Sequence, residues 1–338
     1  MNAARQFSAQ PYDALIVGAG MAGLSAAAEL QRTGRDVVLI DKGRAVGGRM
    51  ATRRIGSAVF DHGAQFFTAR TPRFASAIAH WQEIGVTAEW SRGFTEKEDG
   101  HPRWRGKPGM TAVAKHLAWN FEIFLETEIE ALRRCEEQWN VETTAGENFQ
   151  ARSIILTPPV PQSLALLEAG EVAFSAEMRA RLTSIRYERC LAVMAVLEGP
   201  SRVPAPGGFA PSAGPISWIA DNQQKGISEA PAVTIHASHA FSLQHWERDR
   251  QESGRLLLHA AREWLGAAVT TFQVHGWRYS KPMQVDPDAC AVLSETPPLV
   301  LAGDAFAGPR VEGAALSGWA AAKAIMRAEK TNPRLQFA

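Results

Sequence analysis

The chain has 338 residues, enough for one large or two ordinary domains, because domains usually run about 100 to 200 residues. Its 36 lysines and arginines nearly balance its 35 aspartates and glutamates, so no overall field attracts it to nucleic acid or to an anionic membrane. Its three cysteines are far apart and include no CxxC pair, which indicates neither a disulfide framework nor a zinc site. We therefore expect a cytoplasmic protein with a small-molecule ligand.

The first elements along the chain predict a strand, helix, strand unit. Residues 14–17 form a short apolar run, typical of a strand that is buried on both faces of a parallel sheet. A helix rich in alanine and leucine is expected over 22–30, with Gly34 as its stop signal, and a second buried strand over 37–40. This order is that of a nucleotide-binding α/β fold.

The rest of the chain predicts a helix over 73–84 and then mostly strands. A buried strand over 299–302 precedes Gly303, and a helix of small residues is expected over 313–326. The two halves of the nucleotide fold therefore lie at opposite ends of the sequence, with a second domain inserted between them. The strands expected in the middle cover 121–125, 139–143, 153–156, 189–197, 216–220 and 232–237.

Glycines at the first strand-to-helix junction form a dinucleotide-binding motif. Gly18 permits a tight turn, Gly20 lets the backbone approach a pyrophosphate, and Gly23 lets the helix pack closely on the strand. The start of the helix then offers free N–H groups to the anion. Asp41 ends the second strand, where a carboxylate accepts hydrogen bonds from ribose hydroxyls.

The glycine motif alone does not separate FAD from NAD, and two later segments bear on that choice. Gly47-Gly48-Arg49 follows Asp41 and can bring the arginine guanidinium group against a second part of the cofactor's phosphates. A solvated turn is the competing interpretation. Gly303-Asp304 likewise has a plain helix cap as its alternative.

The run over 41–52 resembles the signature of amine oxidases, phytoene desaturases and protoporphyrinogen oxidases that use FAD. The run over 301–305 resembles the strand and Gly-Asp pair with which such proteins contact the ribityl chain. The run over 311–315 resembles the helix start whose amides face the flavin pyrimidine, where negative charge develops on reduction. FAD is therefore the expected cofactor.

Within that superfamily the chain is similar to the renalase family, including its bacterial members. His62 is a departure, since the family has an apolar residue after the acid. The similarity implies an oxidase that passes hydride from off-pathway dihydronicotinamide isomers to FAD, and electrons then to molecular oxygen, giving peroxide. The segments that carry it are 41–50, 61–68, 107–110, 156–161, 235–237, 277–279 and 310–313.

The expected fold is α/β, with a discontinuous Rossmann-type FAD-binding domain (1–70, 105–165 and 275–338) and a mixed-sheet substrate domain (71–104 and 166–274). In this interpretation Asp41 holds ribose, Arg49 the phosphate edge and Asp304 the ribityl chain, while the backbone near Ile129 meets the adenine. The expected FAD-binding residues are Gly18, Gly20, Met21, Ala22, Gly23, Asp41, Lys42, Gly48, Arg49, Gly63, Ala64, Gln65, Phe66, Ile129, Gly303, Asp304, Glu312, Gly313 and Ala314.

A dihydropyridine is already an activated hydride donor, so the protein has mainly to stack it over the flavin and exclude competing chemistry. We therefore expect no general base. The residues expected at the substrate are Phe67, Trp104, His236, Trp277 and Arg278, each with core packing as its competing interpretation.

The sequence is also compatible with other functions. A flavin amine oxidase needs an aromatic pair around the amine and a lysine near the flavin, for which Lys107 is the candidate. A carotenoid or porphyrinogen desaturase needs an apolar membrane-docking surface, and no pattern in the sequence indicates one. A module that binds FAD without turnover predicts flavin alone. No metal site is expected, because His236 and His239 point to opposite faces if they lie on one strand.

Overall fold

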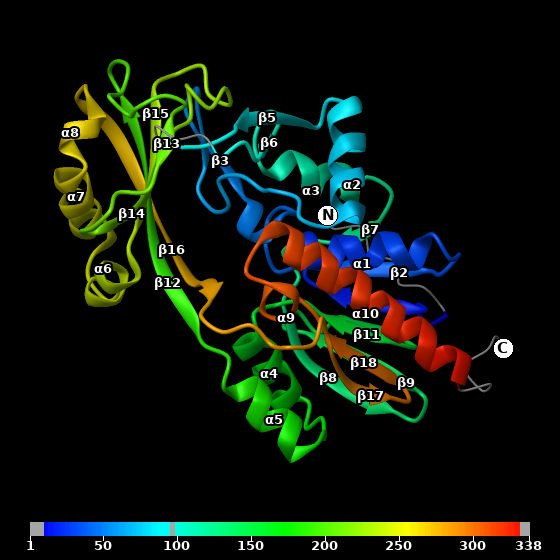
Figure 1. Ribbon diagram of the computed structural model, residues 1–338. Helices are drawn as coiled ribbons and strands as arrows, with labels where there is room; N and C mark the ends of the chain where they lie inside the picture. The colour runs from blue at the N-terminus through cyan, green and yellow to red at the C-terminus, as the bar shows by residue number, and fades with distance from the viewer. Residues whose placement is uncertain (1–9, 95–98, 332–338) are drawn as a thin grey trace, which may run out of the picture. The chain divides into compact units, whose positions relative to one another are not determined.

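The computed structural model describes residues 10–94 and 99–331 and divides into two compact units (Figure 1). The first comprises 10–48, 117–186 and 284–331, and the second 49–94, 99–116 and 187–283. The expected boundaries differ, since 49–70, 105–116 and 275–283 belong to the second unit and 166–186 to the first. One reason is that residues 269–282 form a single strand whose hydrogen-bonded partner is the strand over 187–197, so the pair stays in one unit.

A six-stranded sheet forms the centre of the first unit, in the order β17-β18-β11-β1-β2-β7. Its strands pair in parallel except at the β17 edge, which is antiparallel. Every residue of β1 and β2 is buried, as expected for strands covered on both faces. The strands are β1 (Ala14–Val17), β2 (Val37–Ile40), β7 (Glu122–Phe124), β11 (Ile154–Leu156), β17 (Ala291–Glu295) and β18 (Pro298–Leu301).

Two helices of this unit cross at a glycine. Helix α1 (Met21–Gln31) links β1 to β2, and the long helix α10 (Val311–Thr331) packs against it. A Cβ added at Gly318 of α10 would lie 2.1 Å from the carbonyl oxygen of Ala22 in α1, so only glycine allows this approach. The other elements are α4 (Val160–Ala169), α5 (Ala176–Thr183), α9 (Asp304–Ala307) and the antiparallel sheet of β8 (Ile129–Cys135), β9 (Gln138–Thr143) and β10 (Asn148–Ala151).

The second unit contains a five-stranded sheet in the order β13-β14-β15-β12-β16. All of its pairings are antiparallel, so the expectation of a mixed sheet is wrong in this detail. The reason is that β13, β14 and β15 follow one another as neighbours, which antiparallel pairing allows with short connections. The strands are β12 (Tyr187–Leu197), β13 (Gly208–Phe209), β14 (Ile216–Asp221), β15 (Ala232–Ala237) and β16 (Val269–Pro282).

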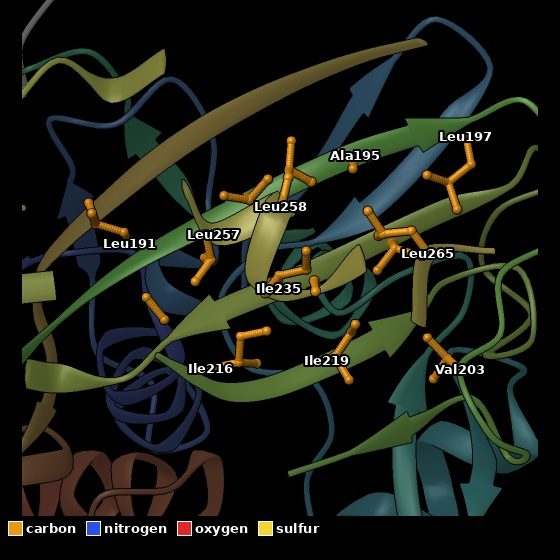
Figure 2. Close-up of a cluster of buried hydrophobic side chains, with 14 of the residues drawn as sticks. Leu191, Ala195, Leu197, Val203, Ile216, Ile219, Ile235, Leu257, Leu258 and Leu265 are labelled. Atoms are coloured by element: carbon orange, nitrogen blue, oxygen red, sulfur yellow. The ribbon is translucent and has the colours of Figure 1, made fainter. Parts of the chain in front are cut away.

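The main core of this unit lies between one face of the sheet and helix α7 (Arg250–Ala260) (Figure 2). Leu191 and Ile235 of the sheet and Leu257 of α7 are each almost fully buried there. Successive side chains of a strand point to opposite faces, so the other face stays available for the loops described below. The remaining elements are β3 (Thr52–Ile55), β4 (Ala58–Asp61), α2 (Pro72–Glu83), β5 (Thr87–Ser91), β6 (Arg103–Gly106), α3 (Thr111–Ala118), α6 (His239–Gln244), α8 (Arg262–Leu265) and the short helix over Gly48–Met50.

The α1 and α10 crossing generates a stability prediction. We expect Gly318→Ala to lower the free energy of unfolding by about 1–3 kcal/mol, because the added methyl group overlaps the α1 backbone. Lys323→Ala on the exposed side of α10 is the control and should change stability by less than about 0.5 kcal/mol. Chemical denaturation of both variants checks this, and equal stabilities would contradict the close helix contact.

Candidate functional site

The glycine loop after β1 in the first unit has the geometry of an anion site. Gly18 has a φ of +100°, and a Cβ added at Gly23 would lie 1.9 Å from the Gly18 carbonyl oxygen. A Cβ added at Gly20, in contrast, would meet nothing within 4 Å. Gly20 is the N-cap of α1 and has no side chain with which to bond the N–H groups at the helix start. Open space beside a helix N-terminus fits the pyrophosphate of a dinucleotide.

Asp41 links the two glycine-rich loops that the sequence presents separately. Its Oδ2 accepts a hydrogen bond from the Ala19 backbone N–H at 2.7 Å, and its Oδ1 accepts one from the Gly43 N–H at 2.6 Å. Gly47 N–H in turn donates to the Ala19 carbonyl oxygen at 2.8 Å. A carboxylate accepts about four hydrogen bonds, so Asp41 retains capacity for ribose hydroxyls. The donor set and the glycine cradle therefore fit FAD.

A second close approach of the backbone follows β18. Gly303 has a φ of +143°, and its N–H donates to the Ser317 hydroxyl of α10 at 2.9 Å. Asp304 begins α9, and Glu312 lies in the first turn of α10, both nearly buried. A Cβ added at Gly313 would lie 2.1 Å from the Gly308 carbonyl oxygen. Ser317 was not predicted, since a serine inside a helix of small residues carries no motif.

The other expected FAD-binding residues of the first unit occupy ordinary places in the fold. Met21 and Ala22 are buried in the first turn of α1, and Ala314 lies in the first turn of α10. Lys42 forms an exposed ion pair with Glu128 at 3.3 Å. Ile129 is the first residue of β8. Gly48 has a φ of +52°.

A buried ion pair holds the loop after β4 in the second unit. Asp61 Oδ2 accepts from Lys225 Nζ at 2.7 Å, and both side chains are 0% exposed. Asp61 Oδ1 accepts from the Thr52 hydroxyl at 2.6 Å and from the Met110 N–H at 2.9 Å. Burial lowers the pKa of Lys225, and the Asp61 carboxylate opposes that shift. Lys225 was missed by sequence reasoning because it lies in no recognisable motif.

His62, next to this pair, is the centre of a cluster of rings. Its carbonyl oxygen accepts from Trp277 Nε1 at 2.8 Å and lies 3.1 Å from His236 Nε2. Its ring stacks on Trp277, with 5.2 Å between centroids and 16° between planes, and meets His275 edge-on at 4.9 Å. The structure thus brings together the predicted Trp277 and His236 around His62, which the sequence marked as a departure from the family.

The histidines of this cluster are neutral at physiological pH. Burial lowers the pKa of His62 to about 3, with further lowering by His275, Arg53 and His236. Burial also lowers the pKa of His236 and of His275 to about 4 each, although the bond to the His62 carbonyl opposes the shift of His236. Every charged or ring neighbour that contributes to these shifts is a histidine, lysine or arginine.

Two buried polar atoms of the loop have no hydrogen-bond partner among the described residues: Gln65 Oε1 and His62 Nδ1. The other end of the Gln65 amide is committed, since Nε2 donates to the Asp61 carbonyl at 2.6 Å and to the Gly63 carbonyl at 3.1 Å. Buried polar groups are nearly always hydrogen-bonded in folded proteins. These two atoms are exceptions to that rule in the described part of the chain.

Backbone packing positions the start of the same loop. A Cβ added at Gly63 would lie 2.0 Å from the Arg49 carbonyl oxygen, which also accepts from the Ala64 N–H at 2.8 Å. Arg49 Nη1 lies 3.3 Å from the Tyr279 carbonyl oxygen. Arg49, Gly63, Ala64, Gln65 and Phe66, expected at FAD, thus belong to the second unit, whereas the pyrophosphate loop belongs to the first.

The remaining predicted aromatic residues divide between two clusters. Phe66 packs with Trp90, Phe94 and Trp218, at 5.1 to 6.2 Å between ring centroids. The Phe67 ring is 3% exposed and contacts the core side of α2, and its backbone bonds that of Trp104 in both directions. Phe67 therefore occupies a core position.

Arg278 is exposed and alternates with Trp277 along β16, so the two side chains point to opposite faces. It is not brought to the ring cluster.

Two features bear on the amine oxidase alternative. Lys107 is exposed at the surface of the second unit. Tyr187 and Tyr279 meet edge to face with 5.5 Å between centroids, so their rings contact each other and leave no slot for an amine between them.

His239 begins helix α6 rather than continuing β15, which corrects the strand interpretation of this position. Within the described ranges no group of three or more His, Cys, Asp or Glu side chains is arranged to hold a metal ion. Nor does any helix described there combine the length and apolar character needed to cross a bilayer.

Comparison with known proteins places the chain among flavoproteins. The profile of the NAD(P)-binding Rossmann-like domain matches residues 16–81, and that of flavin containing amine oxidoreductase matches residues 74–326. Renalase of Mus musculus is 26% identical over 340 residues, covering 93% of this chain and 98% of that protein. L-amino acid oxidase of Cerastes cerastes is 49% identical over only 49 residues, which cover 14% of this chain.

A solved structure of putrescine oxidase bound to putrescine has a TM-score of 0.72 and 15% identity, covering 94% of this chain and 99% of that one. At this identity the likeness shows the fold alone. The chain belongs to the flavin-containing amine oxidoreductase family. It is a renalase-like flavoprotein, an oxidoreductase that depends on FAD, so the predicted α/β fold and the predicted cofactor are confirmed.

Gly20 offers a direct test of the pyrophosphate site. We expect Gly20→Ala to leave the free energy of unfolding of the apoprotein nearly unchanged, because the added Cβ finds open space, but to weaken FAD binding by at least about tenfold. Gln31→Ala, exposed at the far end of α1, is the control and should bind FAD normally. Flavin fluorescence titration of the apoproteins measures this, and normal FAD affinity in Gly20→Ala would refute the assignment.

The neutral histidines predict acid sensitivity. Unfolded histidines take up protons near pH 6.5, whereas His62, His236 and His275 resist protonation until about pH 3 to 4. The unfolded state therefore binds more protons below pH 6.5, and each histidine removes up to about 1.4 kcal/mol of stability per pH unit. Urea unfolding between pH 7 and 5 should show that the free energy of unfolding falls less steeply with pH in His62→Leu than in wild type. In the exposed control His259→Leu it should fall as in wild type. Identical slopes in both variants would contradict the buried neutral state.

Proposed function

We propose that this enzyme oxidises off-pathway dihydronicotinamide isomers of NADH or NADPH to NAD(P)+, with molecular oxygen as electron acceptor. The reaction balances as dihydronicotinamide, oxygen and one proton giving the nicotinamide cation and hydrogen peroxide. Similarity to renalase over 93% of this chain and 98% of that protein supports the proposal. The observation that carries it is the electrostatic character of the His62 cluster.

This cluster suits a neutral ring better than a protonated amine. Amines carry a positive charge near neutral pH and are recognised by carboxylates or by spaced aromatic rings. The charged groups that act on the three histidines here are cationic, and the carboxylate of Asp61 is occupied by Lys225. A dihydropyridine ring is uncharged and flat, like the surfaces of Trp277 and His62 that stack in this cluster.

The roles of the chain's own residues follow from the chemistry. Bound FAD would supply the chemistry of a two-electron acceptor that can react with oxygen. The loop from Gly18 to Gly23 would hold its pyrophosphate through backbone N–H groups, and Asp41 would hold ribose hydroxyls. No side chain has to remove a proton from carbon, because the hydrogen leaves the dihydropyridine with its electron pair. Neutral histidines and a stacked tryptophan are compatible with such a reaction, since orientation and water exclusion are what it needs.

We further place the enzyme in the cytoplasm. Cys135, Cys190 and Cys290 are all free thiols, which is in keeping with a reducing compartment.

The proposal predicts a specific pattern of flavin reduction. The holoenzyme, mixed anaerobically with dihydronicotinamide isomers made by borohydride reduction of NAD+, should lose its visible flavin absorbance within the first turnover, and air should restore the colour with one peroxide per substrate. Ordinary NADH and a panel of amines, putrescine included, serve as comparison substrates and should react far more slowly. Bleaching by an amine but not by the isomers would establish amine oxidase activity instead, and bleaching by neither would leave a flavin-binding module.

A further inference from the structure

Arg181 of helix α5 binds a carboxylate in the segment that follows β16. We propose that Arg181 and Asp286 are positioning residues for FAD: the Arg181 side chain fixes Asp286, and the Asp286 backbone in turn fixes residues 303–305 beside the glycine loop. All of these residues belong to the first unit. Because this role concerns the cofactor, it does not depend on which substrate the enzyme oxidises.

Residues 303–305 lie at the same edge of the six-stranded sheet as the glycine loop. Strands β1, β11 and β18 pair in parallel and in register up to their last residues, so the segments that follow them leave the sheet at one edge. Thr157, which follows β11, contacts both neighbours. Its hydroxyl donates to the Val17 carbonyl oxygen at 2.7 Å, and its own carbonyl oxygen lies 3.7 Å from a Cβ added at Gly303. Ligands of such sheets bind at the carboxyl ends of the strands, so FAD at the glycine loop would lie within reach of residues 303–305.

The Ala305 carbonyl oxygen needs a hydrogen-bond donor from outside its own helix. In a continuing helix it would accept from the N–H of residue 309, but residue 309 is a proline and has none. Ala305 is 1% exposed, so water does not replace the missing donor. The Asp286 N–H supplies it, at 2.7 Å. The position of residues 303–305 therefore depends on where the Asp286 backbone lies.

The Arg181 guanidinium group fixes Asp286 by a two-point contact. Its Nε donates to Asp286 Oδ2 at 2.6 Å, and its Nη2 donates to Oδ1, which also accepts from the Asp288 N–H at 3.0 Å. The Asp286 side chain is 2% exposed, and a two-point contact between planar groups fixes direction as well as distance. Without Arg181 a buried carboxylate would lose its charged partner, and the Asp286 backbone would shift as the side chain turned toward water.

The second carboxylate on Arg181 provides a contrast within the same cluster. Asp288 Oδ2 accepts from Arg181 Nη2 at 2.6 Å, but its side chain is 61% exposed. Exposed ion pairs contribute little, because water and salt screen them. Asp288→Asn therefore removes a charge beside Arg181 without releasing Asp286, which makes it the matched control.

The first measurement is the dissociation constant of FAD, obtained from the fluorescence of flavin released when the holoenzyme is diluted. Arg181→Gln and Asp286→Asn should each raise this constant by about tenfold, as is typical when a group that orients a binding element is lost. Arg181→Lys keeps the charge without the two-point contact and should recover only part of the affinity. The double variant should be no weaker than the weaker single variant, because both substitutions break one contact. Asp288→Asn should bind FAD as wild type does.

A second control separates positioning from overall stability. Arg35 forms an ion pair with Glu329, and the two side chains are 20% and 18% exposed. Glu329 lies about 18 Å along α10 from Ser317, the residue that bonds Gly303, at 1.5 Å of rise per residue. Arg35→Gln therefore breaks a partly buried pair of the same unit at a distance from residues 303–305. It should lower the free energy of unfolding about as much as Arg181→Gln does and leave FAD affinity unchanged.

Amide hydrogen exchange of the holoenzyme shows where the effect lies. In Arg181→Gln, exchange over 284–289 and 303–308 should be about tenfold faster than in wild type, because the bond from Asp286 to Ala305 opens more often. Exchange in β1 should be unchanged. Faster exchange over 303–308 with normal FAD affinity would show that this segment does not position the cofactor.

Unchanged FAD affinity in both Arg181→Gln and Asp286→Asn would overturn the proposal. An equal loss of affinity in Arg35→Gln would also overturn it, because FAD binding would then follow stability alone. If Asp286→Asn does not fold, Arg181→Gln and Arg181→Lys decide the question, since the Arg181 side chain is 30% exposed. None of these measurements requires turnover, so failure of the proposed substrate would leave their outcome unaffected.

Discussion

A fully buried ion pair between Asp61 and Lys225 organises the second unit of this protein. Removing both charges from water is expensive, and the attraction within a pair offsets this only when the remaining hydrogen-bonding capacity is also used. Here Thr52 and the Met110 N–H complete the carboxylate, so β3, the end of β4, the start of α3 and the segment after β14 meet at one side chain. These contacts therefore fix the position of the loop that follows Asp61.

The first unit depends on a different constraint, the close approach of backbone to backbone. Glycines stand where α1 meets β1 and where α10 meets α1, because any Cβ at Gly23 or Gly318 would overlap a carbonyl oxygen. At Gly20, beside the start of α1, an added Cβ would in contrast meet nothing within 4 Å. Close packing and the proposed phosphate site are therefore two consequences of one local geometry.

The family relationship and the site chemistry answer different questions. The fold is shared with putrescine oxidase and with other flavin-dependent oxidases, but a fold does not specify a substrate. Substrate preference depends on which groups are charged and which are unsatisfied. In this chain three neutral histidines, a stacked tryptophan and one committed carboxylate are the features on which we base the proposal of a neutral dihydropyridine as hydride donor.

The sequence by itself determined the nucleotide-binding unit, because its signals are local. The strands over 14–17 and 37–40, the glycine motif between them and Asp41 lie within one short stretch, and each residue type has a backbone reason for its place. Only the tertiary structure decided the domain boundaries, the long strand β16 and the pairing of Asp61 with Lys225, which lie 164 residues apart. Contacts between residues so far apart in the sequence produce no recognisable periodicity or spacing, since they arise when distant strands pair. His62 shows the difference most clearly, because the sequence marks it as a departure from the family, whereas the fold surrounds it with His236, His275 and Trp277.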